Sequence, residues 1–341
     1  MMACTAMFAC IATLTIATVC ATAGATAGAT AGATEGETTL PVLLPFDPVA
    51  VDRFVNAQMA RHRIPSLALA ITHGHQVVHV RGYGEAKPGV PVTGQTQCRM
   101  ASLSKSFTAL AVLQLVERGR MELDAPVARY LPGFALANLS AAARISVRQL
   151  LNHTGSLAAA GFVNGLGAQQ QTLAGRVASL RSASAVAEPG AVFHYFDPNY
   201  HVLARLVEVV SGQAFDAYLR QHVFLPLDMP GTVSAPTSAF SAQPTALLAQ
   251  GHVMAYGAAP PPPELAGFLG GSSGVVSTAA DMAHHLIAQG NHGVYPGRRV
   301  LSAAGISLMQ TPRSSLGACR TWGSSAVIWP QRSIFHRLFV P

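Results

Sequence analysis

Ser102 and Lys105 stand three residues apart at the start of a strongly helical stretch, residues 104–118. Positions i and i+3 fall on one helix face, so the spacing predicts that Lys105 lies one turn beyond Ser102. A serine hydroxyl becomes a good nucleophile only when a base removes its proton, and a lysine can be that base only as the neutral amine. Burial and a helix N-terminus both favour the neutral amine. The pair therefore predicts an activated serine; the alternative is a capped helix with a surface lysine.

Lysine is rare in this chain. Lys87 and Lys105 are its only two lysines, and every other basic residue among the 22 is an arginine. Arginine cannot lose its proton inside a protein, whereas a buried lysine can. Two lysines can also fall anywhere by chance, so the distribution indicates a chemical role for Lys105 without establishing it.

A second polar element, residues 193–200, follows a Pro189-Gly190 turn and leads into an amphipathic helix over residues 200–211. The hydroxyl of Tyr195 can relay a proton, and Asp197, two residues on, can hold a lysine or a substrate amide. The alternative is a core tyrosine beside a helix cap.

Two further motifs invite a functional reading. His73, His75 and His79 could hold a metal, but two of them fall in a predicted turn and none has a carboxylate or cysteine close by in the sequence.

Residues 270–274 fit the G-x-S-x-G pattern of a nucleophile elbow, which needs a strand before it and a helix after it. A proline run precedes them, and no acid after Asp281 could complete a triad, so we expect a flexible loop.

The hydrophobic periodicity predicts strands near the N-terminus and helices in the middle of the chain. We expect a helix over residues 47–61 and a hairpin of two strands, residues 66–71 and 76–81, before a glycine- and proline-rich loop over residues 82–94. Further predicted helices cover residues 104–118, 123–130, 147–152, 200–211, 215–223 and 278–289. This order indicates a helical lobe inserted into a sheet lobe whose remaining strands come from the C-terminal part.

Composition excludes several classes of protein. Half of the residues are apolar and 11% are charged, which excludes a disordered chain. Six of the 22 basic residues follow Asp281, where no acid occurs, so the first 281 residues carry 16 bases against 15 acids. The basic residues are scattered and form no face with interleaved aromatics, so we expect no nucleic-acid partner. The five cysteines match neither a zinc site nor a disulfide framework.

The N-terminus, residues 1–34, is an uncharged apolar run followed by a tandem Ala-Thr-Ala-Gly repeat. It resembles a secretory signal, although no lysine or arginine precedes the apolar run. We expect an exported protein of the periplasm, cell envelope or medium, with membrane anchoring through this segment left open. A wrongly assigned start site is the other reading.

The two polar elements and several segments between and after them resemble the serine β-lactamase and penicillin-binding protein family, in particular its class C β-lactamase, D-Ala-D-Ala carboxypeptidase and esterase branch. The segments that carry the resemblance span residues 46–312 and are 99–108, 123–126, 130–132, 147–154, 195–200, 211–212, 226–229, 270–271 and 277–281.

The resemblance implies an α/β (α+β) fold of the β-lactamase/transpeptidase type, with an antiparallel sheet flanked by helices plus a mostly helical lobe, over residues 45–312. It also implies that Ser102 is acylated, that Lys105 accepts its proton, that Tyr195 belongs to the Y-x-N element, and that Asp197 replaces the asparagine of that element. The backbone N–H of Ser102 would be one oxyanion donor. The family needs no metal and no organic cofactor. His153-Thr154-Gly155-Ser156, where the family has H-T-S-G, is expected to be a turn variant without direct chemical consequence.

The resemblance stops at Pro312. Residues 313–341 are a divergent basic tail with no K-T-G or H-x-G, the third motif of the family. We interpret this tail as a frameshifted or truncated end and expect the C-terminal strands to be incomplete.

Three functions follow from the sequence. The leading one is a serine hydrolase acting on a β-lactam, a D-Ala-D-Ala peptide or a small ester, so that its partner is a small molecule or a peptidoglycan-type peptide. The second is an impaired or inactive protein of the same fold, associated with the cell envelope. The third is an anchored structural protein, which only the N-terminal segment supports.

Overall fold

A computed structural model describes residues 46–158, 172–234, 247–251 and 270–313. The predicted leader, residues 1–34, and nearly all of the basic tail lie outside these residues, so both remain predictions. Within the described ranges, no helix has the length and apolar character needed to cross a membrane.

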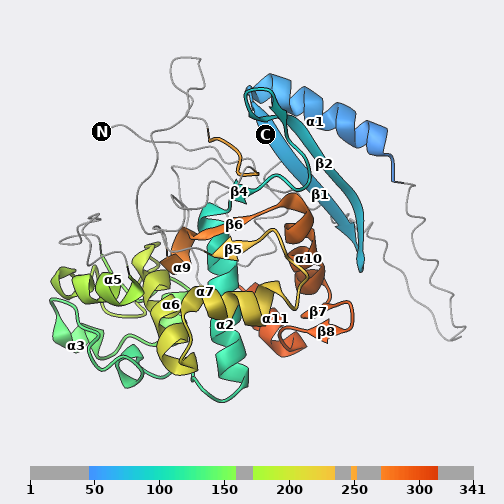
Figure 1. Cartoon of the computed structure of the whole chain (residues 1–341). Helices are drawn as coiled ribbons and strands as arrows, with labels where there is room; N and C mark the ends of the chain where they lie inside the picture. The colour runs from blue at the N-terminus through green and yellow to red at the C-terminus, as the bar shows by residue number, and fades with distance from the viewer. Residues whose placement is uncertain (1–45, 159–171, 235–246, 252–269, 314–341) are drawn as a thin grey trace, which may run out of the picture.

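The N-terminal layer is a helix packed on an antiparallel hairpin. Helix α1 (Pro48–His62) begins at Asp47, whose carboxylate accepts two backbone N–H bonds, and ends at Arg63 in the left-handed conformation. Strands β1 (Ser66–His73) and β2 (Gln76–Lys87) pair antiparallel. Alternation along β1 sends Leu67, Leu69 and Ile71 against α1, while the alternate residues face the main core on the side of helix α10 (Ala279–Gly290) (Figure 1).

The predicted loop over residues 82–94 is wrong. Strand β2 continues through it to Lys87 and pairs with β3 (Val90–Pro91). Its glycines allow close approach of backbones: a Cβ on Gly82 would lie 2.1 Å from the carbonyl oxygen of Val92. A glycine in a strand commonly marks such an approach, and here it was taken for a chain break.

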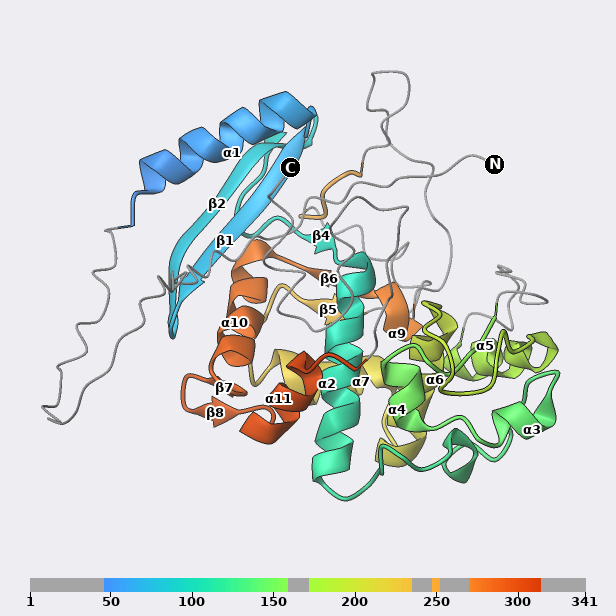
Figure 2. The same ribbon diagram turned by 180° about the vertical axis from the view of Figure 1, so that it is seen from behind.

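Helix α2 (Ser104–Glu117) runs through the centre of the molecule, directly after the 3₁₀ turn η1 (Ala101–Leu103). Residues 104–115 are all buried, so this helix has no solvent face over its first three turns. Helices α6 (Pro198–Ser211) and α7 (Phe215–Leu219) lie on one side of it. The view from behind shows α11 (Ala303–Gln310) and α4 (Val147–Leu151) beside it (Figure 2). Polar side chains on such a helix need partners inside the protein.

The helical lobe covers one flank of α2. Helix α4 starts with a capping box between Ser146 and Gln149, and α6 ends at Gly212 with φ 75°, the left-handed C-cap that the sequence predicts. Its elements are η2 (Val127–Arg129), α3 (Leu139–Ala142), α4 (Val147–Leu151), α5 (Leu173–Ser179), η4 (Leu180–Ser182), α6 (Pro198–Ser211), α7 (Phe215–Leu219) and the π-helical turn η5 (Arg220–Phe224).

The last described elements return to the other flank. A three-stranded antiparallel sheet has the order β4-β6-β5, so that β6 lies beside the start of α2. Thr278 caps α10 and is one of the two caps, Ser277 or Thr278, that the sequence predicts. These elements are β4 (Cys98–Arg99), β5 (Val233–Ser234), α9 (Gly270–Ser273), β6 (Val275–Ser277), α10 (Ala279–Gly290), β7 (Val294–Tyr295), β8 (Arg298–Arg299) and α11 (Ala303–Gln310).

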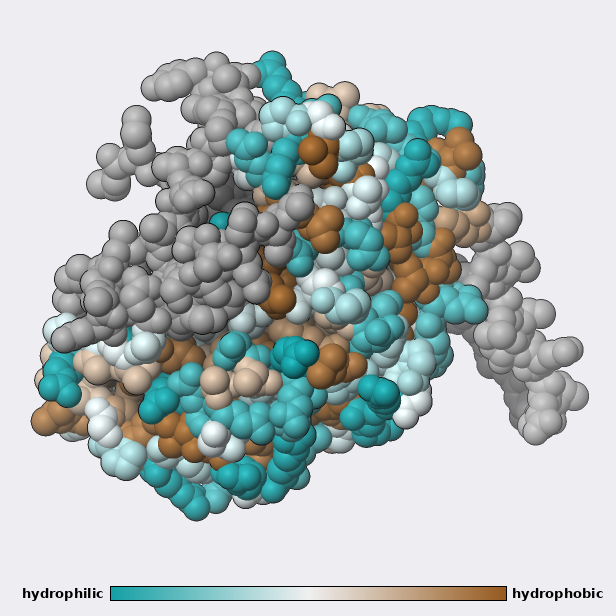
Figure 3. Space-filling model, viewed as in Figure 1, coloured by the Kyte–Doolittle hydropathy of each residue, from teal (hydrophilic) through white to brown (hydrophobic). Residues whose placement is uncertain are grey.

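The predicted combination of antiparallel sheets with flanking helices and a helical lobe is therefore confirmed. The face in Figure 3 mixes hydrophilic residues with scattered apolar ones over the helical lobe. The expected incompleteness of the C-terminal strands concerns residues outside the described ranges.

Candidate active site

Ser102 lies in the turn η1, immediately before α2, and is exposed while the helix behind it is buried. The turn is fixed to strand β6 on both sides of the serine: the Met100 N–H donates to the Val275 carbonyl (2.9 Å), and the Val275 N–H donates to Ser104 Oγ (3.0 Å). Ala101 has φ 44°, a left-handed conformation that non-glycine residues rarely adopt. Such strain persists only where surrounding contacts impose it, and it presents the Ser102 hydroxyl at the surface.

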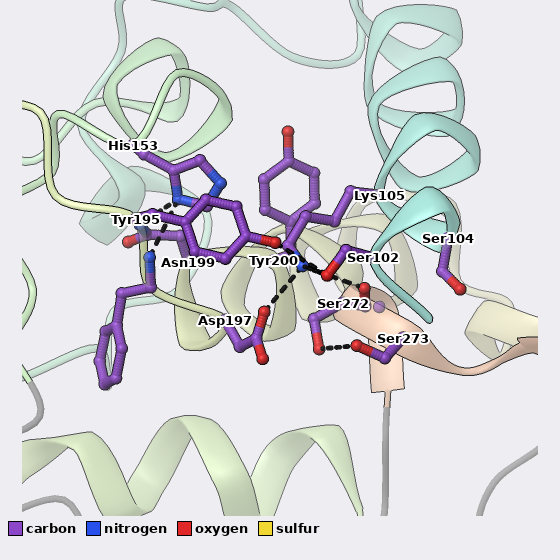
Figure 4. Close-up of polar contacts among 12 residues, drawn as sticks. Ser102, Ser104, Lys105, His153, Tyr195, Asp197, Asn199, Tyr200, Ser272 and Ser273 are labelled. Carbon is purple, nitrogen blue, oxygen red and sulfur yellow. Dashed lines mark hydrogen bonds and ion pairs between the residues drawn. The ribbon is translucent and has the colours of Figure 1, made fainter. Parts of the chain in front are cut away.

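Lys105 is completely enclosed, with an exposed fraction of 0%. Its Nζ has three oxygen neighbours: Ser102 Oγ at 3.1 Å, Asp197 Oδ1 at 2.7 Å and the Ser272 carbonyl at 3.2 Å (Figure 4). The rings of two tyrosines, Tyr195 and Tyr200, also face the nitrogen, with their centres at 4.8 and 5.7 Å. A buried amine is tolerated only with partners of this kind. The predicted pairing of Ser102 with Lys105 is present in the structure.

Tyr195 and Asp197 reach the same place from the segment before α6. The Tyr195 hydroxyl donates to Ser102 Oγ (2.9 Å), and Asp197 forms the ion pair with Lys105. Both side chains are partly exposed, in contrast to the enclosed lysine. The four residues that the sequence singles out thus converge, although more than 90 residues separate the two pairs along the chain.

Residues 270–274 are not the flexible loop expected from the sequence. They form the buried one-turn helix α9, and the element that follows is strand β6 instead of the helix that a nucleophile elbow needs. Gly271 is packed so closely that a Cβ there would lie 2.5 Å from the Ala204 Cβ and 2.5 Å from the Tyr200 carbonyl oxygen. The glycines therefore let α9 approach α6, and this places the Ser272 carbonyl on Lys105. Sequence reasoning missed Ser272, because a backbone acceptor leaves no side-chain signature.

His153 is the second residue that sequence reasoning missed. It is 2% exposed and has φ 58°. Its carbonyl accepts from the His194 N–H (2.8 Å), and its Nδ1 accepts from the Asn199 side-chain amide (2.9 Å) and from the Phe196 N–H (3.4 Å). Burial, followed by the nearby charge of Lys105, lowers the pKa of His153 to about 3. The imidazole is therefore neutral at ordinary pH and can accept at Nδ1.

The three hairpin histidines lie apart from this site. His73 ends β1, His75 is in the turn, and His79 on β2 lies 3.4 Å from the Tyr83 hydroxyl and 3.9 Å from a carboxylate oxygen of Asp52. Among the residues that the structure describes, no group of three or more His, Cys, Asp or Glu has an arrangement that could hold a metal ion.

Comparison with known proteins assigns the family. The family model described as "Beta-lactamase" matches residues 51–333, most of the chain. The chain belongs to the beta-lactamase family. The predicted resemblance is thereby confirmed at the level of the family.

Relatives within the beta-lactamase family include both penicillin-binding proteins and an esterase. "Penicillin-binding protein 4" of Amycolatopsis lactamdurans is 32% identical over 292 residues, which cover 84% of this chain and 75% of that protein. "Esterase EstB" of Burkholderia gladioli is 32% identical over 205 residues, 55% of this chain and 52% of the esterase. The octameric penicillin-binding protein homologue from Pyrococcus abyssi superimposes with a TM-score of 0.66 at 25% identity, over 78% of this chain and 60% of that structure. Together these relatives indicate a serine hydrolase.

Proposed function

We propose that this protein is a serine hydrolase that works through an acyl-serine intermediate, with Ser102 as the nucleophile. The observation that carries the proposal is the position of the Lys105 amine: it lies 3.1 Å from Ser102 Oγ, on a side chain with no solvent exposure. A base must be within hydrogen-bond distance of the proton that it removes, and this pair meets that condition.

The three neighbours of Lys105 hold its amine in place beside the serine. In the neutral form, in which lysine can act as a base, the amine has two N–H donors and one lone pair, and it faces two oxygen acceptors, on Asp197 and Ser272, and one hydroxyl, on Ser102. When both donors point at the acceptors, the lone pair is left for the serine proton. We therefore assign Lys105 as the proton acceptor and Asp197 as the residue that holds it in place.

The reaction then has two balanced steps. Ser102 Oγ forms a bond to the substrate carbonyl carbon while its proton passes to Lys105, and the leaving group departs with a proton relayed from Lys105 through Tyr195, whose hydroxyl lies 2.9 Å from Ser102 Oγ. Water then attacks the acyl carbon and gives a proton to Lys105, the bond from that carbon to Ser102 Oγ breaks, Lys105 returns the proton to Oγ, and the carboxylic acid product leaves. The Ser102 N–H, in the first turn of η1, is the proposed oxyanion donor, because N–H groups at a helix start lack an intrahelical acceptor.

The proposed substrates are a β-lactam, a D-Ala-D-Ala peptide or a small ester, hence a small molecule or a peptidoglycan-type peptide. Both the penicillin-binding-protein and the esterase relatives support this range. We also propose export to the cell envelope, on the evidence of the N-terminal segment and of the penicillin-binding-protein relatives.

A second candidate is an impaired or inactive member of the family. It is favoured by one observation, the lack of K-T-G or H-x-G after Pro312 in the sequence. In the family this motif supplies the second oxyanion donor, and the loss of one such donor lowers the rate by about 10²- to 10³-fold.

The test uses the purified full chain with a fluorescent penicillin and a fluorescent fluorophosphonate, and the Ser102→Ala variant as control. Covalent labelling of the wild type alone, mapped to Ser102 by mass spectrometry, is the expected result. Labelling that persists in Ser102→Ala would refute the assignment of the nucleophile. A labelled protein that turns over no ester, penicillin or D-Ala-D-Ala peptide would favour the impaired member.

A further inference from the structure

Tyr195 projects from a segment with little support of its own. The segment from Phe193 to Asp197 lies between a turn and the start of α6 and belongs to no sheet. Tyr195 is 43% exposed. An exposed tyrosine on an irregular segment would ordinarily sample several rotamers, yet its hydroxyl must stay 2.9 Å from Ser102 Oγ to relay a proton.

A single residue, His153, holds this segment in place. The two peptide N–H groups that flank Tyr195 both donate to His153: that of His194 to its carbonyl and that of Phe196 to its Nδ1. The imidazole also packs against the Tyr195 ring, with the ring centres 4.4 Å apart and the planes 39° apart (Figure 4). Backbone and side chain of His153 thus act on the same tyrosine from three sides.

His153 is itself held in position. It follows α4, and its positive φ turns the carbonyl toward residue 194. The next residues contact the chain that leads to Tyr195, because the Gly190 N–H donates to the Thr154 carbonyl (2.7 Å) and the Val186 N–H donates to the Ser156 carbonyl (2.8 Å). The Asn199 amide, at 2.9 Å, fixes the imidazole so that Nδ1 is the acceptor.

We infer that His153 is a positioning residue for the acylation step: its two acceptors and its ring hold Tyr195 in hydrogen-bond contact with Ser102. This inference rests on the proposed function. His153 forms no hydrogen bond with Ser102 or Lys105, and the side chain of the site that it contacts directly is Tyr195, so we assign its effect to Tyr195. The sequence expectation that the 153–156 turn lacks direct chemical consequence is compatible with this indirect role.

The test compares two substitutions that both tolerate the left-handed backbone. His153→Asn keeps a side-chain acceptor at the place of Nδ1, whereas His153→Gly has no side-chain acceptor and keeps only the backbone carbonyl. The readout is the rate of fluorophosphonate labelling of Ser102 in the full chain. A misplacement of about 1 Å costs on the order of 10²-fold, so we expect His153→Gly to label about 10- to 100-fold more slowly and His153→Asn to recover most of that loss.

A double-mutant cycle separates positioning from a general loss of structure. In a Tyr195→Phe background the hydroxyl is absent, so His153→Gly should slow labelling by less than about threefold there. His285→Asn is the matched control, because His285 is equally buried but contacts Phe107 and Ser106 Oγ (3.4 Å) instead of Tyr195. It should lower the thermal midpoint without slowing the labelling.

Each outcome decides a separate claim. If His153→Gly labels at the wild-type rate, or slows labelling equally with and without the Tyr195 hydroxyl, the positioning role is wrong. If the wild type itself does not label, the proposed function fails instead. Should the glycine variant not fold, His153→Gln takes its place in the cycle, because its amide oxygen lies one atom farther out, near the position of Nε2.

Discussion

The packing of Gly271 permits a quantitative prediction about a residue that carries no side chain. Alanine at this position would place a Cβ 2.5 Å from the Ala204 Cβ and 2.5 Å from the Tyr200 carbonyl oxygen. Carbon atoms in contact prefer about 3.5–4.0 Å, so α9 and α6 must separate by about 1 Å. Both partners belong to the rigid helix α6, and so the shift falls mainly on the one-turn helix α9.

That shift acts on Lys105. The Ser272 carbonyl lies 3.2 Å from Nζ, and a further displacement of about 1 Å removes it from hydrogen-bond range. Overpacking of this kind costs about 1–3 kcal/mol in stability, and a misplaced catalytic group costs on the order of 10²-fold in rate. We therefore expect Gly271→Ala to unfold at lower urea concentration and to label about 10²-fold more slowly with fluorophosphonate.

The matched control is Gly290→Ala. Gly290 also lies in a helix, α10, but a Cβ there meets nothing within 4 Å. Alanine is favoured over glycine in a helix by about 0.5–1 kcal/mol, so this variant should be as stable as the wild type or more so, and equally fast. A Gly271→Ala protein with wild-type stability and labelling rate would refute the packing argument. Reduced stability with an unchanged rate would refute only the link to Lys105.

Three further predictions concern charge and proton balance. Asp197→Asn keeps an oxygen acceptor for the Lys105 amine, so this variant should label within about 10-fold of the wild-type rate. Asp197→Ala leaves the buried amine without that acceptor and should label at least about 10-fold more slowly than Asp197→Asn. Equal labelling rates for the two variants would contradict the role of Asp197 in holding Lys105. Lys105→Arg should reduce labelling by about 10²- to 10⁴-fold, because arginine is larger and cannot give up its proton, and normal labelling would exclude Lys105 as the base. Burial lowers the pKa of His153 and His201 to about 3 and that of His285 to about 4. The unfolded chain takes up these protons near pH 6.5 and the folded chain does not, so stability is fully present above that pH and falls by about 2 kcal/mol per histidine between pH 7 and pH 5. Urea unfolding at both pH values measures this loss, and equal stability at the two would contradict it.

Periodicity and capping residues predicted the helices that position the site. The hydrophobic spacing located α2 to within one residue, Gly212 marked the end of α6, and Ser277 or Thr278 marked the start of α10, which Thr278 caps. These signals are local: each depends on residues within a turn of one another, and one sequence is sufficient to show them. The convergence of Ser102, Lys105, Tyr195 and Asp197 was predictable for a different reason, because it followed from the resemblance to a family and not from spacing alone.

The errors share a physical cause. The glycines at 82 and 271 were interpreted as loop positions, but each is closely approached by other backbone: that of Val92, which is paired beside β2, at Gly82, and that of Tyr200, from the distant helix α6, at Gly271. His153 escaped notice because its role depends on two peptide groups about 40 residues away. Contacts of this type have no short-range pattern, so a single sequence cannot display them.

The enclosure of Lys105 has a practical consequence for handling this protein. The chain has two side-chain amines, and only that of Lys87, which is partly exposed at the end of β2, can be reached from solvent. Amine-reactive dyes or activated beads should therefore couple through Lys87 or the chain terminus and spare the interior amine. Such chemistry offers a nearly single-point tether to a solid support on the hairpin layer, with the serine left open to the medium.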